Sequence, residues 1–269
     1  MPDQPPVTLG PIGRFVSIEW IDRTGSTNTD LVALVRSDPE FQRVGQVLVA
    51  DEQTSGRGRR GRLWSMPAGS GILLSAFVPW ADAATTHLVP TALGVAAVDA
   101  AHSLDIGLSI KWPNDLLESG PQGRKVAGML SEIVYPEAGG NHMGVVAGIG
   151  INVSWPTPDD AASNADVAGA TCLDQLAPHP VDRQRLVVDL IAHLDQELIG
   201  LESVGPEPLL GRYRNRCATL GRMVRIEQAD GSSRVGRATD IDGSGRLVLD
   251  DDGTLTHVGV GDVVHLRPA

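Results

Sequence analysis

Cysteine and long apolar runs are scarce in this sequence, and each scarcity excludes a class of protein. The two cysteines, Cys172 and Cys217, lack metal-ligand spacing and are too few for a disulfide framework. No window holds the roughly 18 consecutive apolar residues that a membrane-spanning helix needs. The first residues have no basic segment followed by an apolar one, as a secretory signal would. We therefore expect a cytoplasmic protein that does not enter a membrane.

Positive charge is also in deficit. The chain has 22 Lys and Arg against 33 Asp and Glu, for a net charge of −11. Such a surface repels nucleic acid and anionic lipid, so we expect neither as a partner. Of the basic residues, only Lys111 and Lys125 are lysines. Because lysine supplies a compact, flexible point charge that arginine does not replace, both are candidate site residues.

The chain divides into regions of different composition. Residues 1–13 contain four prolines and no periodic pattern, which predicts a flexible tail. Residues 14–217 alternate strand-like and helix-like segments and predict a larger α+β domain. Residues 218–269 lack Phe, Trp and Tyr and consist of short strands between Gly and Asp turns, typical of a small β-barrel. In the larger domain we expect strands at 15–20, 46–50, 72–78, 108–112, 126–135 and 145–153, and helices at 30–35, 86–104 and 182–201.

The segment 56–62, Gly-Arg-Gly-Arg-Arg-Gly-Arg, holds four arginines in seven residues. Glycines leave its amide groups free to wrap an anion, and guanidinium groups bind carboxylate or phosphate in pairs. The arginines repel one another, so we expect residues 55–70 to be mobile until an anion neutralises them. A solvated basic loop is the alternative. An acidic context and the aromatic Trp64 directly afterwards favour an anion site.

Three further segments each allow a structural and a functional interpretation. Lys111 precedes Trp-Pro-Asn-Asp, so Asp115 either pairs with a buried lysine or lies near a Mg²⁺-bound phosphate. Lys125 opens a strand, either in solvent or beside a reacting carboxylate and phosphate. Gly148 and Gly150 share one strand face, which marks a bulge or lets a flat ring approach the backbone.

Together these segments resemble the biotin protein ligase family, the biotin–[acetyl-CoA-carboxylase] ligases. The arginine segment and the Lys-Trp-Pro-Asn-Asp block are the most specific part of the resemblance. The matching blocks, in family order, are Thr24-Gly25-Ser26-Thr27-Asn28, the stretch from Asp51 to Trp64, Lys111-Trp112-Pro113-Asn114-Asp115, Arg124-Lys125-Val126-Ala127-Gly128 and Gly148-Ile149-Gly150-Ile151-Asn152.

The resemblance implies a fold and a reaction. The fold is a mixed-sheet catalytic domain of the biotin/lipoate ligase type at 14–217, followed by an SH3-like β-barrel at 218–269. ATP and biotin would form biotinyl-5′-AMP with Mg²⁺ present, and a lysine of a biotin carboxyl carrier domain would then accept the biotin. No tightly bound prosthetic group is expected, and the chain would act as a monomer or weak homodimer.

The resemblance also assigns residues to roles. Arg57, Arg59, Arg62 and Lys125 are expected to be catalytic, since fixed cations reduce the repulsion between two joining anions. The expected biotin-binding residues are Ser26, Thr27, Asn28, Gln53, Gly56, Arg57, Gly58, Arg59, Trp64, Lys125, Gly128 and Gly148. The expected ATP-binding residues are Arg59, Arg62, Lys111, Lys125, Asn152, Trp155 and Arg267, with Asp115 as the candidate Mg²⁺ ligand.

Two alternatives remain open. One is a lipoate or octanoate ligase or transferase on the same scaffold, and the other is a non-catalytic adaptor that binds anions through the arginine segment. Many relatives carry a helix-turn-helix of about 60 residues before the catalytic domain. Here only 14 residues precede the first expected strand, so we expect no sequence-specific DNA binding.

Overall fold

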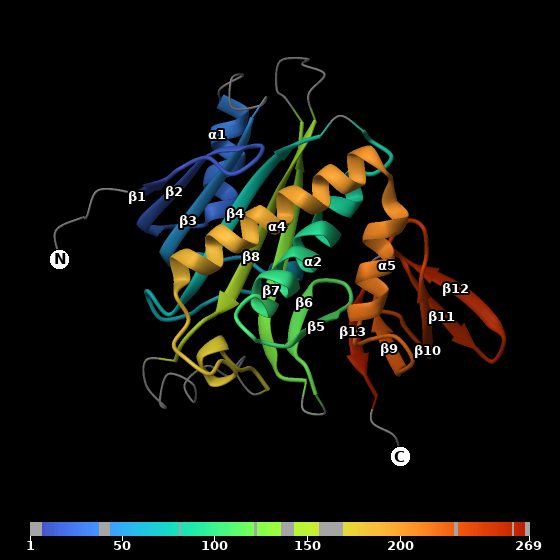
Figure 1. Ribbon diagram of the computed structural model, residues 1–269. Helices are drawn as coiled ribbons and strands as arrows, with labels where there is room; N and C mark the ends of the chain where they lie inside the picture. The colour runs from blue at the N-terminus through green and yellow to red at the C-terminus, as the bar shows by residue number, and fades with distance from the viewer. Residues whose placement is uncertain are drawn as a thin grey trace.

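A computed structural model describes residues 7–37, 44–80, 82–120, 123–135, 143–155, 169–228, 231–259 and 261–266. It contains two sheets, one of eight strands and one of five (Figure 1). Among the described residues, no helix combines the length and apolar character needed to cross a membrane. The two cysteines are buried and unpaired.

The eight-stranded sheet has the order β1-β2-β3-β4-β8-β7-β6-β5. Its strands are antiparallel except for the parallel pair β2 and β3. All of β8 and most of β4 are buried, because these central strands are covered on both faces. The strands are β1 (Val7–Leu9), β2 (Phe15–Thr24), β3 (Gly45–Gln53), β4 (Gly71–Pro79), β5 (Leu108–Lys111), β6 (Asp115–Glu118), β7 (Lys125–Val134) and β8 (Gly144–Asn152).

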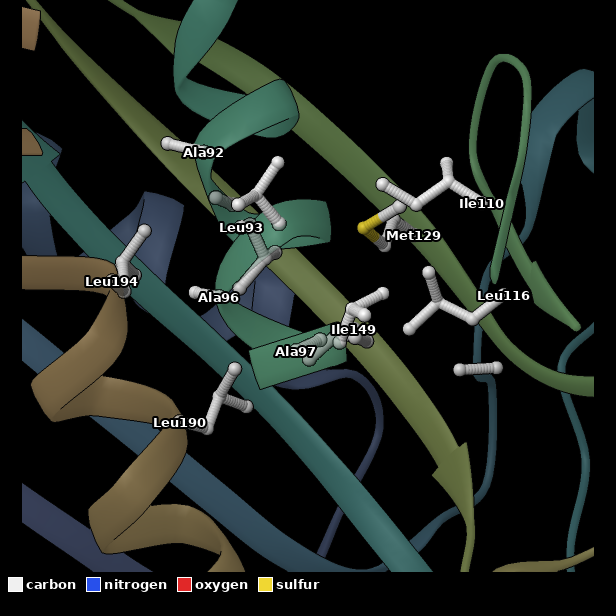
Figure 2. Close-up of a cluster of buried hydrophobic side chains, with 14 of the residues drawn as sticks. Ala92, Leu93, Ala96, Ala97, Ile110, Leu116, Met129, Ile149, Leu190 and Leu194 are labelled. Carbon is white, nitrogen blue, oxygen red and sulfur yellow. The ribbon is translucent and has the colours of Figure 1, made fainter. Parts of the chain in front are cut away.

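Helices cover one face of this sheet with an apolar layer. Helix α2 (Val89–His102) follows the short turn η3 (Thr86–Leu88), and its alanines let it pack closely on the strands. Helix α4 (Arg183–Ser203) lies across α2, and the side chain of Asp182 caps it by accepting from the Gln184 and Arg185 amides. Figure 2 shows Ala96 of α2 and Leu190 of α4 in the same cluster as Ile149 of β8.

The opposite face carries α1 (Thr27–Ser37) and leaves room for a site. Leu31 and Val35 of α1 pack on Phe77 of β4 and Val146 of β8. Helix α1 spans only part of this face. Its first turn lies over the middle of the sheet, where β4, β8 and β7 run side by side.

The C-terminal sheet has the order β12-β11-β10-β9-β13, with every pair antiparallel. Strand β10 pairs with β9 through its first half and with β11 through its second, bending at an irregularity between Ala238 and Asp240. The strands are β9 (Met223–Glu227), β10 (Ser233–Ile241), β11 (Leu247–Asp251), β12 (Thr254–Val258) and β13 (Asp262–His265).

The small domain is docked on the larger one. The indole N–H of Trp112 donates to the Gly245 carbonyl over 3.1 Å, and the Ala218 amide donates to the Ile110 carbonyl over 2.8 Å. Buried residues of both sheets belong to one apolar cluster. A domain of this size gains much of its stability from such shared burial.

The expected α+β architecture with a small all-β domain is confirmed. Two strands and one α-helix were not expected, namely β1, β6 and α5 (Pro206–Arg216), which follows the turn η5 (Leu173–Gln175) and α4. Helix α5 carries two prolines in its first turn and has few apolar residues, so its periodicity is weak. The domain boundaries at 217 and 218 stay predictions.

The expected tail at residues 1–13 is corrected in part. Val7–Leu9 form β1, which pairs with the edge of β2, and Ile12 bridges Phe15. An edge strand of three residues needs only extended backbone and leaves no periodic side-chain signal. Residues 1–6 lie outside the described part of the chain.

His265 lies at the contact between the two domains. Its Nε2 is 3.1 Å from the hydroxyl of Thr219, which also accepts from the Trp112 amide. Burial, together with the positive charges of Lys111 and Arg222, lowers the pKa of His265 to about 4. An unfolded histidine titrates near pH 6.5, so between these values the unfolded chain binds more protons and stability rises with pH.

We predict that the stability from neutral His265 is present above about pH 6.5 and is lost as pH falls toward 4. In His265→Gln this part of the pH dependence disappears. Urea-unfolding midpoints at about pH 7 and about pH 5 measure it for both proteins. Equal losses in the two proteins would contradict the prediction.

Candidate active site

A cavity of about 670 Å³ opens on the sheet face that carries α1. It receives the first turn of α1, the loop between β3 and β4, the strand ends around β5 to β8, and part of β13 from the small domain. The cavity therefore needs both domains. The expected site residues that line it are Ser26, Thr27, Asn28, Gln53, Arg57, Gly58, Arg59, Arg62, Trp64, Lys111, Asp115, Lys125, Gly128, Gly148, Asn152 and Trp155.

Of the expected site residues that the structure describes, Gly56 does not line it. A Cβ on Gly56 would lie 2.2 Å from the Trp64 carbonyl oxygen. The glycine therefore lets the backbone of Trp64 pass close to its own backbone. The Trp64 amide donates to the Gly56 carbonyl over 3.0 Å, which closes the base of the loop. Arg267 lies outside the described residues.

One end of the cavity is polar and has no net charge, because Arg57 and Glu132 pair with each other beside Asn28. The side-chain oxygen of Gln53 accepts from the Thr27 amide over 2.8 Å and lies 3.1 Å from the Thr27 hydroxyl. The Asn28 amide group donates to the Leu130 carbonyl over 3.1 Å. Ser26, Thr27 and Asn28 are all buried, so their polar groups serve the cavity or one another rather than bulk water.

The floor of the cavity consists of glycine backbone on β7 and β8. A Cβ on Gly128 or Gly150 would lie 2.9 Å and 2.4 Å from the Trp64 ring, so the indole packs directly on these residues. The indole nitrogen of Trp64 is buried without a hydrogen-bond partner, which is costly for a donor. Lys125 Nζ lies 5.3 Å from the centre of this ring. Trp64 thus holds the middle of the cavity.

The other end is charged, and both lysines of the chain meet there. Lys125 Nζ is 2.7 Å from one Asp115 carboxylate oxygen, and Lys111 Nζ is 4.0 Å from the other. Nearby, the side chain of Asn152 donates to the Thr171 carbonyl over 3.1 Å, and Trp155 lines the same end.

Asp115 does not fit a resident Mg²⁺ site. Its carboxylate is held between two ammonium groups, which would repel a divalent cation. Moreover, the described residues contain no group of three or more His, Cys, Asp or Glu placed to hold a metal ion. Of the two interpretations of Asp115, the pairing with lysine is the one the structure displays.

The arginine segment at residues 56–62, here called the arginine loop, closes the charged end of the cavity through contacts with the small domain. The Arg60 guanidinium lies 3.3 Å from the Asp262 carboxylate and donates to the Glu227 carbonyl over 2.7 Å. Arg62 also donates to Asp262, and Arg59 lies 3.8 Å from it. One carboxylate therefore offsets the mutual repulsion of three guanidinium groups.

The remaining contacts of the loop fix it to the catalytic sheet. Arg59 donates to the Asn114 side chain over 3.2 Å, while Asn114 itself donates to the Met129 carbonyl over 2.9 Å. Arg57 lies 3.4 Å from Glu132 on β7. Burial lowers the pKa of Arg59, since a charged group loses solvation there. The mobility of residues 55–70 without ligand stays a prediction.

Sequence reasoning missed three contributors to the site. Ser75, a polar residue within the apolar run of β4, is fully buried against Thr27 and Asn28. Asp262 and Asn114 hold the arginines. The lone serine in an apolar strand was a usable signal, whereas nothing local indicated that Asp262 would reach a loop 200 residues away.

Comparison with known proteins places this geometry in a family. A model described as the biotin/lipoate A/B protein ligase family matches residues 20–152, and one described as the biotin protein ligase C terminal domain matches residues 219–266. The biotin–[acetyl-CoA-carboxylase] ligase of Mycobacterium tuberculosis is 37% identical, covering 96% of this chain and 92% of its own. The chain belongs to the biotin protein ligase family.

Other family members and solved structures agree. The bifunctional ligase/repressor BirA of Escherichia coli is 30% identical over 96% of this chain and 75% of its own. This chain spans 66% of the length of the Bacillus subtilis ligase/repressor. A biotin protein ligase from Aquifex aeolicus, solved with biotin and ATP, shares the fold with a TM-score of 0.72 and 22% identity, covering 95% of this chain and 99% of that one.

We predict that Asp262→Asn loosens the arginine loop, because the guanidinium groups then lose their shared counter-charge. Trypsin cuts after arginine, so the rate of cleavage within residues 57–62 reports how often the loop opens. We expect that rate to rise severalfold.

Asp251→Asn is the matched control, since it removes the same charge from an exposed position of the small domain. The prediction fails if both variants are cut at the wild-type rate, or if both are cut faster to the same extent.

Proposed function

We propose that this chain activates biotin with ATP as biotinyl-5′-AMP and transfers it to a lysine of a biotin carboxyl carrier domain. One observation carries the proposal. A single cavity joins an uncharged hydrogen-bonding end to an end with two lysines and several arginines, across a glycine floor. A substrate with a polar head, an apolar chain and a terminal carboxylate fits this order of environments.

In the first step, a biotin carboxylate oxygen forms a bond to the α-phosphorus of ATP, and the bond from that phosphorus to pyrophosphate breaks. Both reactants are anions, so their approach is opposed by repulsion. Lys125 would neutralise the pair, while Arg59 and Arg62 would hold the phosphates that leave. Positioned cations of this kind stabilise a transition state without reorganising at the moment of reaction.

In the second step, the amine of the acceptor lysine attacks the carbonyl carbon of the mixed anhydride, and AMP leaves with the bonding electron pair. The biotin chain would pack on the Trp64 indole, which itself lies on the glycine floor of β7 and β8. Thr27, Asn28 and Gln53 would bind the head group. Asn152, Trp155 and Lys111 would face the nucleotide.

Lys125 is paired with the Asp115 carboxylate before any substrate binds. The Lys125 ammonium group, 2.7 Å from a carboxylate oxygen of Asp115, already points to a place where an anion is accepted. A substrate carboxylate would share or replace that partner. Little free energy is therefore needed to orient the ammonium group when the substrate binds.

Several expectations around this function stay predictions. They are Mg²⁺ as the counter-ion of the nucleotide, the carrier domain as acceptor, a monomer or weak homodimer, no nucleic-acid partner and a cytoplasmic location. The printed name of the Mycobacterium tuberculosis relative supports an acetyl-CoA carboxylase as the source of the carrier domain.

Pyrophosphate release with biotin, lipoate and octanoate in parallel tests the function. We expect release with biotin and ATP, and no release above background with the other two acids. Release with lipoate or octanoate instead would identify a ligase of the alternative kind on the same scaffold. Release with none of the acids would favour the adaptor.

We predict that Lys125→Ala lowers the rate of biotinyl-5′-AMP formation by roughly a hundredfold or more, as does the loss of a comparable charge-stabilising group elsewhere. Lys125→Arg keeps the charge and should retain part of the activity. The rate is measured by pyrophosphate release in a single turnover. An unchanged rate in Lys125→Ala would remove Lys125 from the reaction.

A further inference from the structure

A chain of four oxygen atoms crosses the uncharged end of the cavity. It runs from Gln53 Oε1 through the hydroxyls of Thr27 and Ser75 to Asn28 Oδ1. The three successive oxygen–oxygen distances are 3.1 Å, 2.7 Å and 2.5 Å. Ser75 is completely buried on β4 and does not line the cavity, so it acts only through its two neighbours.

The two amide groups at the ends of this chain have fixed orientations. Asn28 donates through its nitrogen to the Leu130 carbonyl, so its oxygen faces Ser75. Gln53 presents its oxygen to the Thr27 amide at 2.8 Å, so it too is an acceptor. Both ends of the chain therefore accept, and only the two hydroxyl groups in the middle carry protons.

Two protons cannot fill three contacts. The shorter contacts need them most, because two oxygens at 2.5 Å or 2.7 Å repel strongly without a proton between them. On these distances we assign the Ser75 proton to Asn28 and the Thr27 proton to Ser75, in place of a bond from Thr27 to Gln53 or from Ser75 to Thr27. Gln53 Oε1 still has a donor in the Thr27 amide. With its own proton committed to Ser75, the Thr27 hydroxyl can only accept a hydrogen bond from the cavity.

The backbone around Ser75 keeps this arrangement in place. Ser75 pairs with Gly148 on the neighbouring strand β8. A Cβ at Gly148 would lie 2.1 Å from Asn28 Oδ1, so the glycine makes the space that the Asn28 side chain fills. Thr27 and Asn28 begin helix α1, whose later turns pack on the same strands. All members of the chain thus stand on rigid elements.

We propose that Ser75 is a positioning residue that fixes the Thr27 hydroxyl as an acceptor and thereby selects a substrate head group that donates an N–H. The inference rests on the proposed function and deepens it. The ureido ring of biotin offers such a donor at its head. The dithiolane ring of lipoate and the alkyl end of octanoate offer none, and they would leave the buried acceptor unpaired.

Calorimetric titration with biotin in the absence of ATP gives the first test. Ser75→Ala should bind biotin roughly three- to tenfold more weakly, the usual value of one hydrogen bond. Its affinity for ATP should equal that of the wild type. Ser75→Cys keeps the volume with a weaker donor and should lie in between, and it replaces Ser75→Ala if the latter does not fold.

Ser131→Ala is the matched control. Ser131 stands on the adjacent part of the sheet in β7, and its buried hydroxyl has no hydrogen-bond partner. Its removal should leave the affinity for biotin unchanged. A loss of biotin affinity equal to that of Ser75→Ala would show that any hole in the sheet weakens binding, and would overturn the proposal.

A double-mutant cycle with Thr27→Val separates positioning from independent effects. If Ser75 acts through Thr27, the double variant binds biotin no more weakly than Thr27→Val alone. Losses that multiply would overturn the proposal, as would a Ser75→Ala affinity within twofold of the wild type. If the wild type released pyrophosphate with lipoate and failed to bind biotin, the proposed function would fall first and this inference with it. If the wild type released pyrophosphate with biotin and Ser75→Ala bound biotin as tightly as the wild type, only this inference would be overturned and the proposed function would stand.

Discussion

The need to balance a dense group of cations inside an acidic chain determines how the two domains are joined. The arginine loop and the two lysines bring several positive charges to one end of a cavity. Left alone, they would push the loop away from the sheet. Two carboxylates of the chain offset this repulsion: Asp262 pairs with three arginines, and Asp115 pairs with both lysines. Each carboxylate takes a position that an anionic substrate could share, so the same pairs that stabilise the fold also prepare the site.

The small domain follows from this constraint as much as from its own core. A five-stranded sheet of this length buries little surface alone, and it gains stability through the contacts of Trp112 and Thr219 with the larger domain. Those contacts also place Asp262 above the arginine loop. Removing the domain would therefore expose apolar surface and release the loop together. Buried residues of the two sheets also belong to one apolar cluster, so the domains are packed together and not joined only by a flexible linker.

Sequence reasoning succeeded where the signal was local and failed where it was distant. The periodic leucines of α4 and the apolar runs of β4 and β8 could be predicted from their spacing. The spacing of Gly148 and Gly150 indicated a shared strand face, whereas Gly128 was assigned only by the family resemblance. The composition of residues 218–269 indicated the small domain. Helix α5 was missed because it is held by tertiary contacts rather than by periodicity, and β1 because an edge strand needs only backbone. Asp262 could not be found, since its role depends on a contact between segments about 200 residues apart. The role of Asp115 toward Mg²⁺ stays a prediction; its pairing with both lysines could not be predicted, because the sequence does not show which cations lie nearest.

The two ends of the cavity work by opposite physical rules, and their separation gives a substrate only one orientation. At the charged end, selection depends on Coulomb attraction, which tolerates small displacements and any anion of suitable size. At the uncharged end, selection depends on the directions in which the Thr27 and Ser75 hydroxyl groups donate. Replacing one of these hydroxyl groups would change the direction in which the other donates. Between the two ends, Gly128 and Gly150 leave a flat floor on which the Trp64 indole lies. Under the proposed function, a molecule that is anionic at one end and donates at the other would be bound in a single direction, which would carry its carboxylate to the cations. Orientation is in this way decided by the end of the cavity that does no chemistry.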